Sequence, residues 1–348
     1  MNNMSVGMPG YVVVTDYIEV NSGKDVSDGI QKIIDENPHR TIYFPDGEYI
    51  LAKPICTSAH PDRAVHLELS RFATLKASDD WSDSEALVRL GAAEHFNTIY
   101  INGSNYGIIG GIIDGNMKAN GIAIESGRET IIRDLSIKHT QIGIHIKTGA
   151  NSGSSDADID VVHIVGNNKK DSIGVLIEGA DNSLTNMRIA ACQTGIMLRR
   201  CGNLLRNIHP LHIFGYEYGG VDDMEYTDTV AFWDQTRGKN WYNYCYSDQP
   251  STAFRIMGGS TGIFDNCFAM WYSPRGDKEI GFECEGKFCA SILNADINFR
   301  GDAKNRKFLT VGEEGGFGII ENPIFNTALN EDEAYADYLV GKVVCDKQ

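Results

Sequence analysis

Short runs of alternating apolar residues recur along the chain, and many of them open with glycine. Four copies read GIAI, GIHI, GVLI and GIML and begin at Gly121, Gly143, Gly174 and Gly195. Their starts are separated by 22, 31 and 21 residues, and weaker copies follow at 253–256 and 281–284. Alternation with a period of two is typical of a β-strand that buries one face. The pattern therefore predicts a series of similar strands.

A second pattern is interleaved with the first and places Asn or Asp between apolar positions. It occurs at 131–137, 184–189, 204–208, 263–268 and 292–297. A strand of four to six residues cannot bury its apolar face alone, so successive copies must stack about 4.8 Å apart around one core. Repeated Asn residues can form a ladder at the bends. Helical patterns are scarce between residues 97 and 325, which argues against a βαβ architecture.

One amphipathic helix is predicted near the N-terminus, over residues 27–36. Its apolar face holds Ile30, Ile33 and Ile34. Asp25 or Ser27 can cap its start. The helix is followed by TIYF, a PDG turn and a second strand that ends near Ile50.

These N-terminal elements resemble those of the pectate-lyase-like β-helix superfamily. The residues concerned are IYFPDGEYI at 42–50, KPI at 53–55 and ATLKA at 73–77. The superfamily includes polygalacturonase-like hydrolases, phage tailspikes and inulin fructotransferases. The resemblance implies an all-β fold, a right-handed single-stranded parallel β-helix, in which helix 27–36 caps the first turn. It also implies a carbohydrate as the class of substrate.

The patterns divide the chain into three parts. Residues 1–24 form an N-terminal extension, residues 25–326 the β-helix with its capping helix, and residues 327–348 a C-terminal capping tail with a short acidic helix and a strand. A solenoid offers long flat flanks, and these are compatible with a homotrimer.

The net charge of −16, from 31 basic and 47 acidic residues, argues against a nucleic-acid partner. No basic and apolar leader opens the chain, and no run of 18 apolar residues suits a membrane span. We expect a cytoplasmic protein, with secretion or association with a virion as alternatives. The eight cysteines lack a C-x-x-C pair. Four of them are expected as reduced core residues: Cys192, Cys245, Cys267 and Cys284.

The repeat is most strongly interrupted between Pro210 and Asp228, and residues 214–246 combine acidic and aromatic side chains. Glycoside cleavage uses two carboxylates, and sugar rings pack on aromatic faces. The candidate catalytic residues are Asp222, Asp223, Glu225, Asp228 and Asp234. The candidate sugar-binding residues of this segment are Tyr216, Trp233, Trp241 and Tyr242. The competing interpretation is a solvated acidic loop over core aromatics.

A second group of candidates for substrate binding comprises Arg199, Arg200 and His209. Lyases of the superfamily use a basic residue to abstract the proton next to a uronate carboxyl, while Ca²⁺ held by acidic side chains neutralises that carboxyl. Glu178 lies one repeat before Arg199, so a surface ion pair is the competing interpretation.

Of the four motifs of polygalacturonase-like hydrolases, only an Asp-Asp pair is present, at 222–223. The catalytic roles of that group are therefore not transferred. The leading hypothesis is an enzyme that cleaves or rearranges glycosidic bonds in an oligo- or polysaccharide with paired carboxylates and without a cofactor or metal. The alternatives are a Ca²⁺-dependent polysaccharide lyase and a non-catalytic, glycan-binding or phage-fibre-like β-helix.

Overall fold

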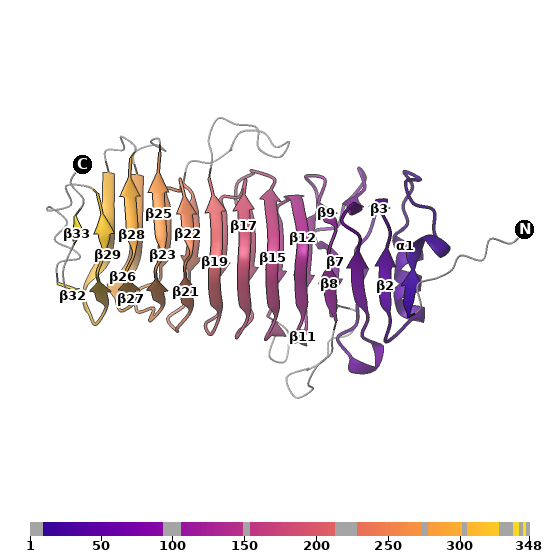
Figure 1. Cartoon of the computed structure of the whole chain (residues 1–348), viewed down its shortest axis with the longest axis horizontal. Helices are drawn as coiled ribbons and strands as arrows, with labels where there is room; N and C mark the ends of the chain where they lie inside the picture. Colours follow the sequence, from indigo (N-terminus) through magenta and orange to yellow (C-terminus); the bar gives the residue numbers. More distant parts are fainter. Residues whose placement is uncertain are drawn as a thin grey trace, which may run out of the picture. The chain divides into compact units, whose positions relative to one another are not determined.

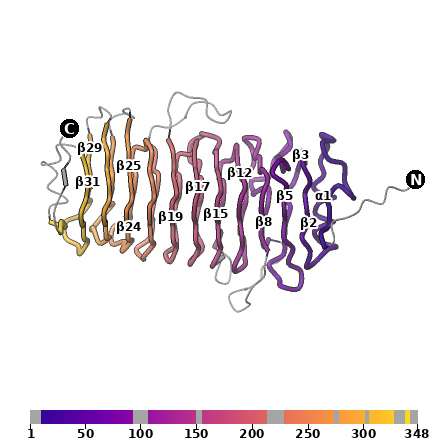
Figure 2. The backbone as a smooth tube through the Cα atoms, in the orientation of Figure 1, coloured from indigo at the N-terminus to yellow at the C-terminus, as the bar shows by residue number. Residues whose placement is uncertain are grey.

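The computed structural model describes residues 10–92, 106–148, 154–212, 228–272, 278–300, 305–326, 337–340 and 344–345. The chain divides into two compact units, Met1–Val165 and Gly166–Gln348. In each unit short strands follow one another around a solenoid, and we call one turn of it a coil (Figures 1 and 2). The strands predicted for the single solenoid of residues 25–326 are found in both units.

The predicted helix is present in the first unit as α1 (Ser27–Glu36). Ile30, Ile33 and Ile34 are its buried apolar residues, as expected. The Asp25 carboxylate accepts a hydrogen bond from the Ser27 backbone N–H at 2.9 Å, and it therefore satisfies one of the free donors at the start of the helix.

Three series of parallel strands make up the first unit. One contains β1 (Tyr11–Val13), β2 (Thr41–Phe44), β5 (His66–Leu69), β8 (Gly107–Ile109) and β12 (Ile131–Thr140). The second contains β3 (Gly47–Leu51), β6 (Ala73–Ala77) and β9 (Ile112–Asp114), and it also ends on β12. The third contains β4 (Ile55–Cys56), β7 (Ala86–Leu90), β10 (Asn120–Ile124) and β13 (Ile142–Ile146). The PDG turn predicted before residue 50 joins β2 to β3.

Smaller elements complete the first unit. They are the 3₁₀ turns η1 (Val14–Asp16) and η2 (Pro61–Arg63) and the strand pair β11 (Gly127–Arg128) and β14 (Ser154–Ser155). The strand β15 (Asp158–Gly166) ends at the boundary of the unit.

The second unit repeats this arrangement. Its first series runs from β17 (Ser183–Ala190) to β19 (Leu204–Leu211) and then divides into two rows. One row contains β21 (Trp241–Asn243), β24 (Ile263–Asp265), β27 (Ser291–Leu293), β30 (Ile319–Glu321) and β32 (Leu339–Val340). The other contains β22 (Tyr246–Asp248), β25 (Phe268–Trp271), β28 (Asp296–Phe299), β31 (Ile324–Phe325) and β33 (Val344–Cys345).

The remaining series of the second unit carries the glycine motif. It contains β16 (Ile173–Ile177), β18 (Thr194–Leu198), β20 (Val230–Asp234), β23 (Thr252–Ile256), β26 (Lys278–Phe288) and β29 (Asn305–Gly316). Equivalent residues of successive coils pack on one another inside. The rings of Phe232 and Phe254 stack with centroids 5.0 Å apart, and those of Phe254 and Phe282 with centroids 4.9 Å apart. One shared core therefore supports strands that are individually too short to be stable.

A ladder of asparagines follows the bends of the second unit, as predicted. Asn186, Asn207, Asn266 and Asn294 all adopt positive φ values of 51–53°. Asparagine tolerates this left-handed conformation better than most side chains. The Asn207 amide donates to Asn186 Oδ1 at 2.7 Å, so the side chains also connect one coil to the next.

Two further expectations concern the tail and the cysteines. The tail contributes the short strands β32 and β33, whereas its predicted acidic helix lies outside the described residues. Cys192, Cys245, Cys267 and Cys284 are buried free thiols, as expected. Within the described part of the chain, no helix combines the length and the apolar character needed to span a membrane.

Candidate functional site

The outer edge of the β18–β29 series carries a row of equivalent residues, one from each coil. The backbone N–H of Arg199, Gln235 and Met257 donates to the coil before it, in each case at 2.8 Å. Glu285 continues the row, because Ile256 and Cys284, the residues before Met257 and Glu285, are register partners. The side chains are linked at the start of the row, where Arg199 Nε donates to Gln235 Oε1 at 3.2 Å.

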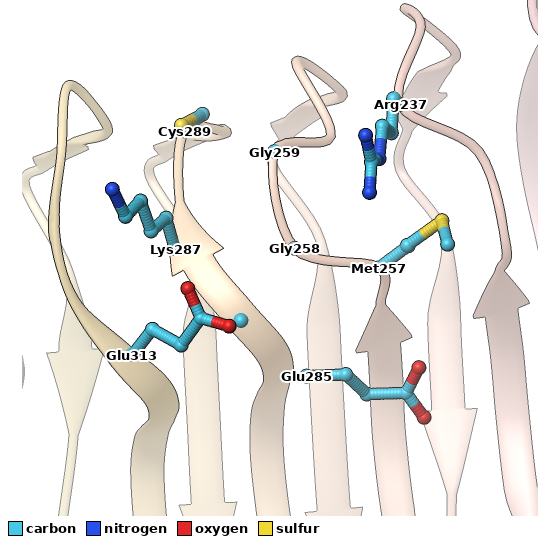
Figure 3. A pocket seen from close by; sticks show the side chains of 9 residues that line it. Arg237, Met257, Gly258, Gly259, Glu285, Lys287, Cys289 and Glu313 are labelled. Atoms are coloured by element: carbon cyan, nitrogen blue, oxygen red, sulfur yellow. The ribbon is translucent and has the colours of Figure 1, made fainter.

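An open pocket of about 410 Å³ lies at the far end of this row (Figure 3). Its lining comes from the turn after β20, the turn after β23, and strands β26 and β29. The lining residues are Arg237, Met257, Gly258, Gly259, Glu285, Gly286, Lys287, Cys289 and Glu313. A pocket of this size, edged by charged groups, suits a polar ligand of a few rings.

Part of the pocket wall consists of backbone atoms alone, because glycines occupy these positions. A Cβ atom on Gly258 would lie 2.6 Å from the Gly286 Cα atom, so a side chain at residue 258 would force the two coils apart. Gly259, which follows it, has a φ of 81°, a conformation that glycine adopts without strain. These two positions therefore keep open the space between the charged side chains.

Two exposed carboxylates face this space from neighbouring strands. Glu285 lies on β26 and Glu313 on β29, and Figure 3 shows both side chains pointing the same way from their strands. Neither carboxylate forms an ion pair with another described residue. Arg237 and Lys287 supply the positive charges of the lining. The pocket thus holds two acids without an ion-pair partner among the described residues, and two bases.

The cluster next to this row contains two of the predicted residues, Trp233 and Asp228. The Arg255 guanidinium carbon lies 5.2 Å from the centre of the Trp233 ring. Arg255 Nε donates to Glu283 at 2.6 Å, and its Nη2 lies 3.4 Å from Asp228. Burial would raise the pKa of Glu283, but hydrogen bonds from Lys278 and Arg255 lower it below its ordinary value. Glu283 is therefore a stably ionised partner of Arg255.

The expectations for Asp234 and Tyr242 require correction. Both side chains point into the core and are 1% exposed, so neither can contact a glycan at the surface. Asp234 accepts hydrogen bonds from Asn240 at 3.0 Å and from the Tyr242 hydroxyl at 2.9 Å. Burial raises the pKa of Asp234 despite these hydrogen bonds. The carboxylate organises the turn after β20 rather than a catalytic site.

Three other predicted substrate-binding residues lie elsewhere on the second unit. Arg200 is exposed in the turn after β18. His209 stacks on Tyr246 with centroids 4.0 Å apart, and its Nε2 lies 3.7 Å from Asp248. His209 therefore belongs to the β19–β22 side, and neither Arg200 nor His209 lines the pocket. Arg199 is on the row that leads to the pocket, but its Nη1 also donates to Glu178 at 2.9 Å, as the ion-pair interpretation expects.

Four of the predicted residues lie outside the described part of the chain: Tyr216, Asp222, Asp223 and Glu225. Trp241 is described, and its side chain is exposed at the start of β21. Within the described part of the chain, the predicted site residues therefore do not come together at one place.

The pocket carboxylates were absent from the sequence prediction, although a signal for them exists. Met257, Glu285 and Glu313 recur at intervals of 28 residues, and Gly258 and Gly286 are separated by the same interval. Equal spacing in a solenoid places residues at similar positions of successive coils. This holds for Met257 and Glu285, whereas an irregularity in the pairing of β26 with β29 places Glu313 opposite Lys287. Among the described residues, no group of three or more His, Cys, Asp or Glu side chains could hold a metal ion.

Comparisons with solved structures agree with this architecture. The tailspike of the E. coli bacteriophage HK620 is 11% identical and matches 92% of this chain and 66% of its own, with a TM-score of 0.58. The chain has the right-handed parallel β-helix fold. A second match to this β-helix is the tailspike gp49 of the Acinetobacter baumannii bacteriophage Fri1, a capsular polysaccharide depolymerase. It is 10% identical over 97% of this chain and 63% of its own, with a TM-score of 0.56.

A third match is an iota-carrageenase complexed to iota-carrageenan fragments. It is 12% identical over 82% of this chain and 56% of its own, with a TM-score of 0.41. The chain thus spans less than two thirds of each of these structures. Identities at this level establish the fold alone. No protein-family model and no curated protein matches the chain.

Proposed function

We propose that this β-helix is a glycan-cleaving enzyme whose substrate, an oligo- or polysaccharide, binds in the pocket between β23 and β29. The observation that carries the proposal is the pair of carboxylates, Glu285 and Glu313, which have no ionic partner among the described residues and face the same glycine-lined space. Glycoside cleavage needs one acid to protonate the leaving oxygen and one carboxylate to activate water or attack the sugar.

The two carboxylates come from neighbouring coils, but not from equivalent positions. Glu313 is the register partner of Lys287, and the pairing of β26 with β29 is irregular between Cys284 and Phe288. Inverting glycosidases have carboxyl groups about 6.5–9.5 Å apart and retaining ones about 5–5.5 Å apart, so the configuration of the released sugar distinguishes the two mechanisms.

The similarity to gp49, whose described activity is the depolymerisation of a capsular polysaccharide, supports a polymeric substrate. It supports the class of ligand only, because the identity is 10%. The positive side chains of Arg237 and Lys287 would suit a sugar that carries a carboxylate or a sulfate.

The same two cations favour β-elimination as a second candidate reaction. In that reaction Arg237 or Lys287 would bind the uronate carboxyl and disperse the charge that develops when one of the two pocket carboxylates takes the neighbouring proton. The glycosidic C–O bond would then break, and the second pocket acid would protonate the leaving oxygen. The two candidates differ in their products. Both release a new reducing end, but elimination leaves an unsaturated sugar with ultraviolet absorbance at the new non-reducing end, whereas hydrolysis consumes water and leaves a saturated one.

The test uses the variants Glu285→Gln and Glu313→Gln, with Glu314→Gln as the matched control, because Glu314 is an exposed neighbour outside the pocket lining. Release of reducing ends is measured on a panel of neutral, uronic and sulfated polysaccharides. We expect each pocket variant to lose activity by about 100-fold or more, while Glu314→Gln remains as active as the parent. Full activity in both pocket variants would rule out this site.

A further inference from the structure

Two exposed aromatic side chains lie close together in sequence on the β19–β24 side of the second unit. Trp241, at the start of β21, is 40% exposed, and Tyr244, one residue past the end of the strand, is 56% exposed. Neither residue lines the pocket. Large exposed aromatics of this kind, when edged with polar groups, mark surfaces that bind a partner or a ligand.

The backbone of Tyr244 carries a conformational cost. Its φ is 53°, and it occupies a position of the bend ladder that is held by Asn207 and Asn266 on the coils to either side, at 51° and 52°. A bulky side chain is disfavoured in the left-handed region, whereas asparagine is tolerated there. The chain thus has a tyrosine where the fold alone favours an asparagine. Strain that the fold does not require points to a function.

The surface around these rings is rich in amides and carboxylates. Asn243 lies between the two aromatics, and its amide donates to Asp265 Oδ2 at 3.2 Å. The Asn266 amide donates to Asp265 Oδ1 at 2.9 Å. Each of these groups has further donor or acceptor capacity. They form a polar border beside the rings.

Apolar side chains flank Trp241 on the neighbouring strands. Leu204 and Ile263 are the register partners of Trp241 on the two neighbouring coils. Leu204 is exposed and Ile263 half-buried. An indole flanked by aliphatic groups and edged by amides matches a saccharide, whose rings have apolar C–H faces and a rim of hydroxyls.

We propose that Trp241 and Tyr244 form an open saccharide-binding site, separate from the pocket, that holds a glycan chain on the β19–β24 side of the second unit. It shares the class of ligand with the proposed function, but it uses other residues. In this site Trp241 packs on a sugar ring, Tyr244 supplies a second ring surface and a hydroxyl, and Asn243 and Asp265 hydrogen-bond to hydroxyls of the sugar.

The experiment measures glycan binding by the full chain and its variants. A printed glycan array identifies the polysaccharides that the parent chain binds, and native affinity gels containing those polysaccharides give dissociation constants. The variants are Trp241→Ala and Tyr244→Asn, with Phe72→Ala as the control for loss of an exposed aromatic far along the sequence. We expect each site variant to bind at least about tenfold more weakly and the control to bind like the parent.

Tyr244→Asn distinguishes a binding role from a structural one. It restores the residue found at the neighbouring bends, so its melting temperature should equal or exceed that of the parent while its affinity falls. Unchanged affinity in both site variants overturns this proposal, as does a parent chain that binds no glycan on the array. The proposed function fails through a different result, unchanged turnover in Glu285→Gln and Glu313→Gln.

Discussion

The guanidinium carbon of Arg255 lies 5.2 Å from the centre of the Trp233 ring, on the outer surface of β20 and β23. Replacing Arg255 with Met removes this contact and also leaves Glu283 without its closest partner, at 2.6 Å. Because the Arg255 side chain is only 11% exposed, we expect the free energy of unfolding to fall by about 1–3 kcal/mol. Urea titration followed by circular dichroism measures the change.

The matched control for that experiment is Arg255→Lys. It keeps the charge but cannot donate from a planar fork, so its stability should lie between those of the parent and Arg255→Met. If Arg255→Met is as stable as the parent, Lys278, which lies 2.8 Å from Glu283, compensates fully for the lost ion pair between Arg255 and Glu283.

A second prediction concerns how the stability of the first unit depends on acidic pH. Glu125 accepts hydrogen bonds from Arg89 at 2.6 Å and Lys147 at 3.0 Å. Burial would raise its pKa, but these cations lower it below the ordinary value of 4.5. The group therefore stabilises the folded chain above pH 4.5, and this contribution is lost as the pH falls through the lower, folded-state pKa.

The measurement is the melting temperature as a function of pH. The parent should lose stability as the pH is lowered below 4.5, whereas Glu125→Gln should be less stable at neutral pH and show a flatter acid limb. A slope in the variant equal to that of the parent would assign the acid sensitivity to other carboxylates.

A third prediction concerns a strained residue on β15 in the first unit. Val161 has a φ of 54° and is 36% exposed, and a β-branched residue is an outlier in that region. Replacing Val161 with Asn should stabilise the chain by about 1 kcal/mol, because the strain is relieved and little buried area is lost. The readout is the unfolding midpoint in urea. Val161→Ala is the control, and it should gain less, since alanine lacks the polar group that suits this bend.

A fourth prediction concerns the buried amide ladder of the second unit. The Asn203 backbone N–H donates to Asn240 Oδ1 at 3.0 Å, and the Asn203 side-chain oxygen accepts from Asn182 Nδ2 at 2.9 Å. Replacing Asn203 with Ala removes the side-chain oxygen to which both the Asn182 backbone N–H and Asn182 Nδ2 donate, at a cost of about 1–3 kcal/mol, whereas the backbone bond to Asn240 stays. Thermal unfolding tests this. Asn207→Ala is the control, since Asn207 is exposed and should cost less.

The strands and the capping helix could be predicted from the sequence because their signals are local. The alternation at 121–124 gives β10, and the spacing of three isoleucines gives α1. Which side chains face outward at the end of a strand was harder to predict. Asp234 was assigned to the surface, yet its register partners are Leu198 and Ile256, both in the core. Aligning each coil with its neighbours would have shown that Asp234 and Tyr242 point inward.

The pocket could not be predicted because it depends on how turns from different coils meet. The 28-residue spacing relates Glu285 to Glu313 in the sequence, but it does not show that they face one space, which depends on the strand register and on the turns beside them. The sequence prediction instead followed the density of acidic residues at 222–234, and three of those acids fall outside the described residues.

The equal spacing of Met257, Glu285 and Glu313 also bears on how such a site can change over time. Met257 and Glu285 come from equivalent positions of neighbouring coils, so gain or loss of a whole coil, as one module, by recombination would preserve the strand pairing while exchanging one wall of the pocket. Specificity in this molecule can therefore evolve in steps of one module, and not only by point substitution.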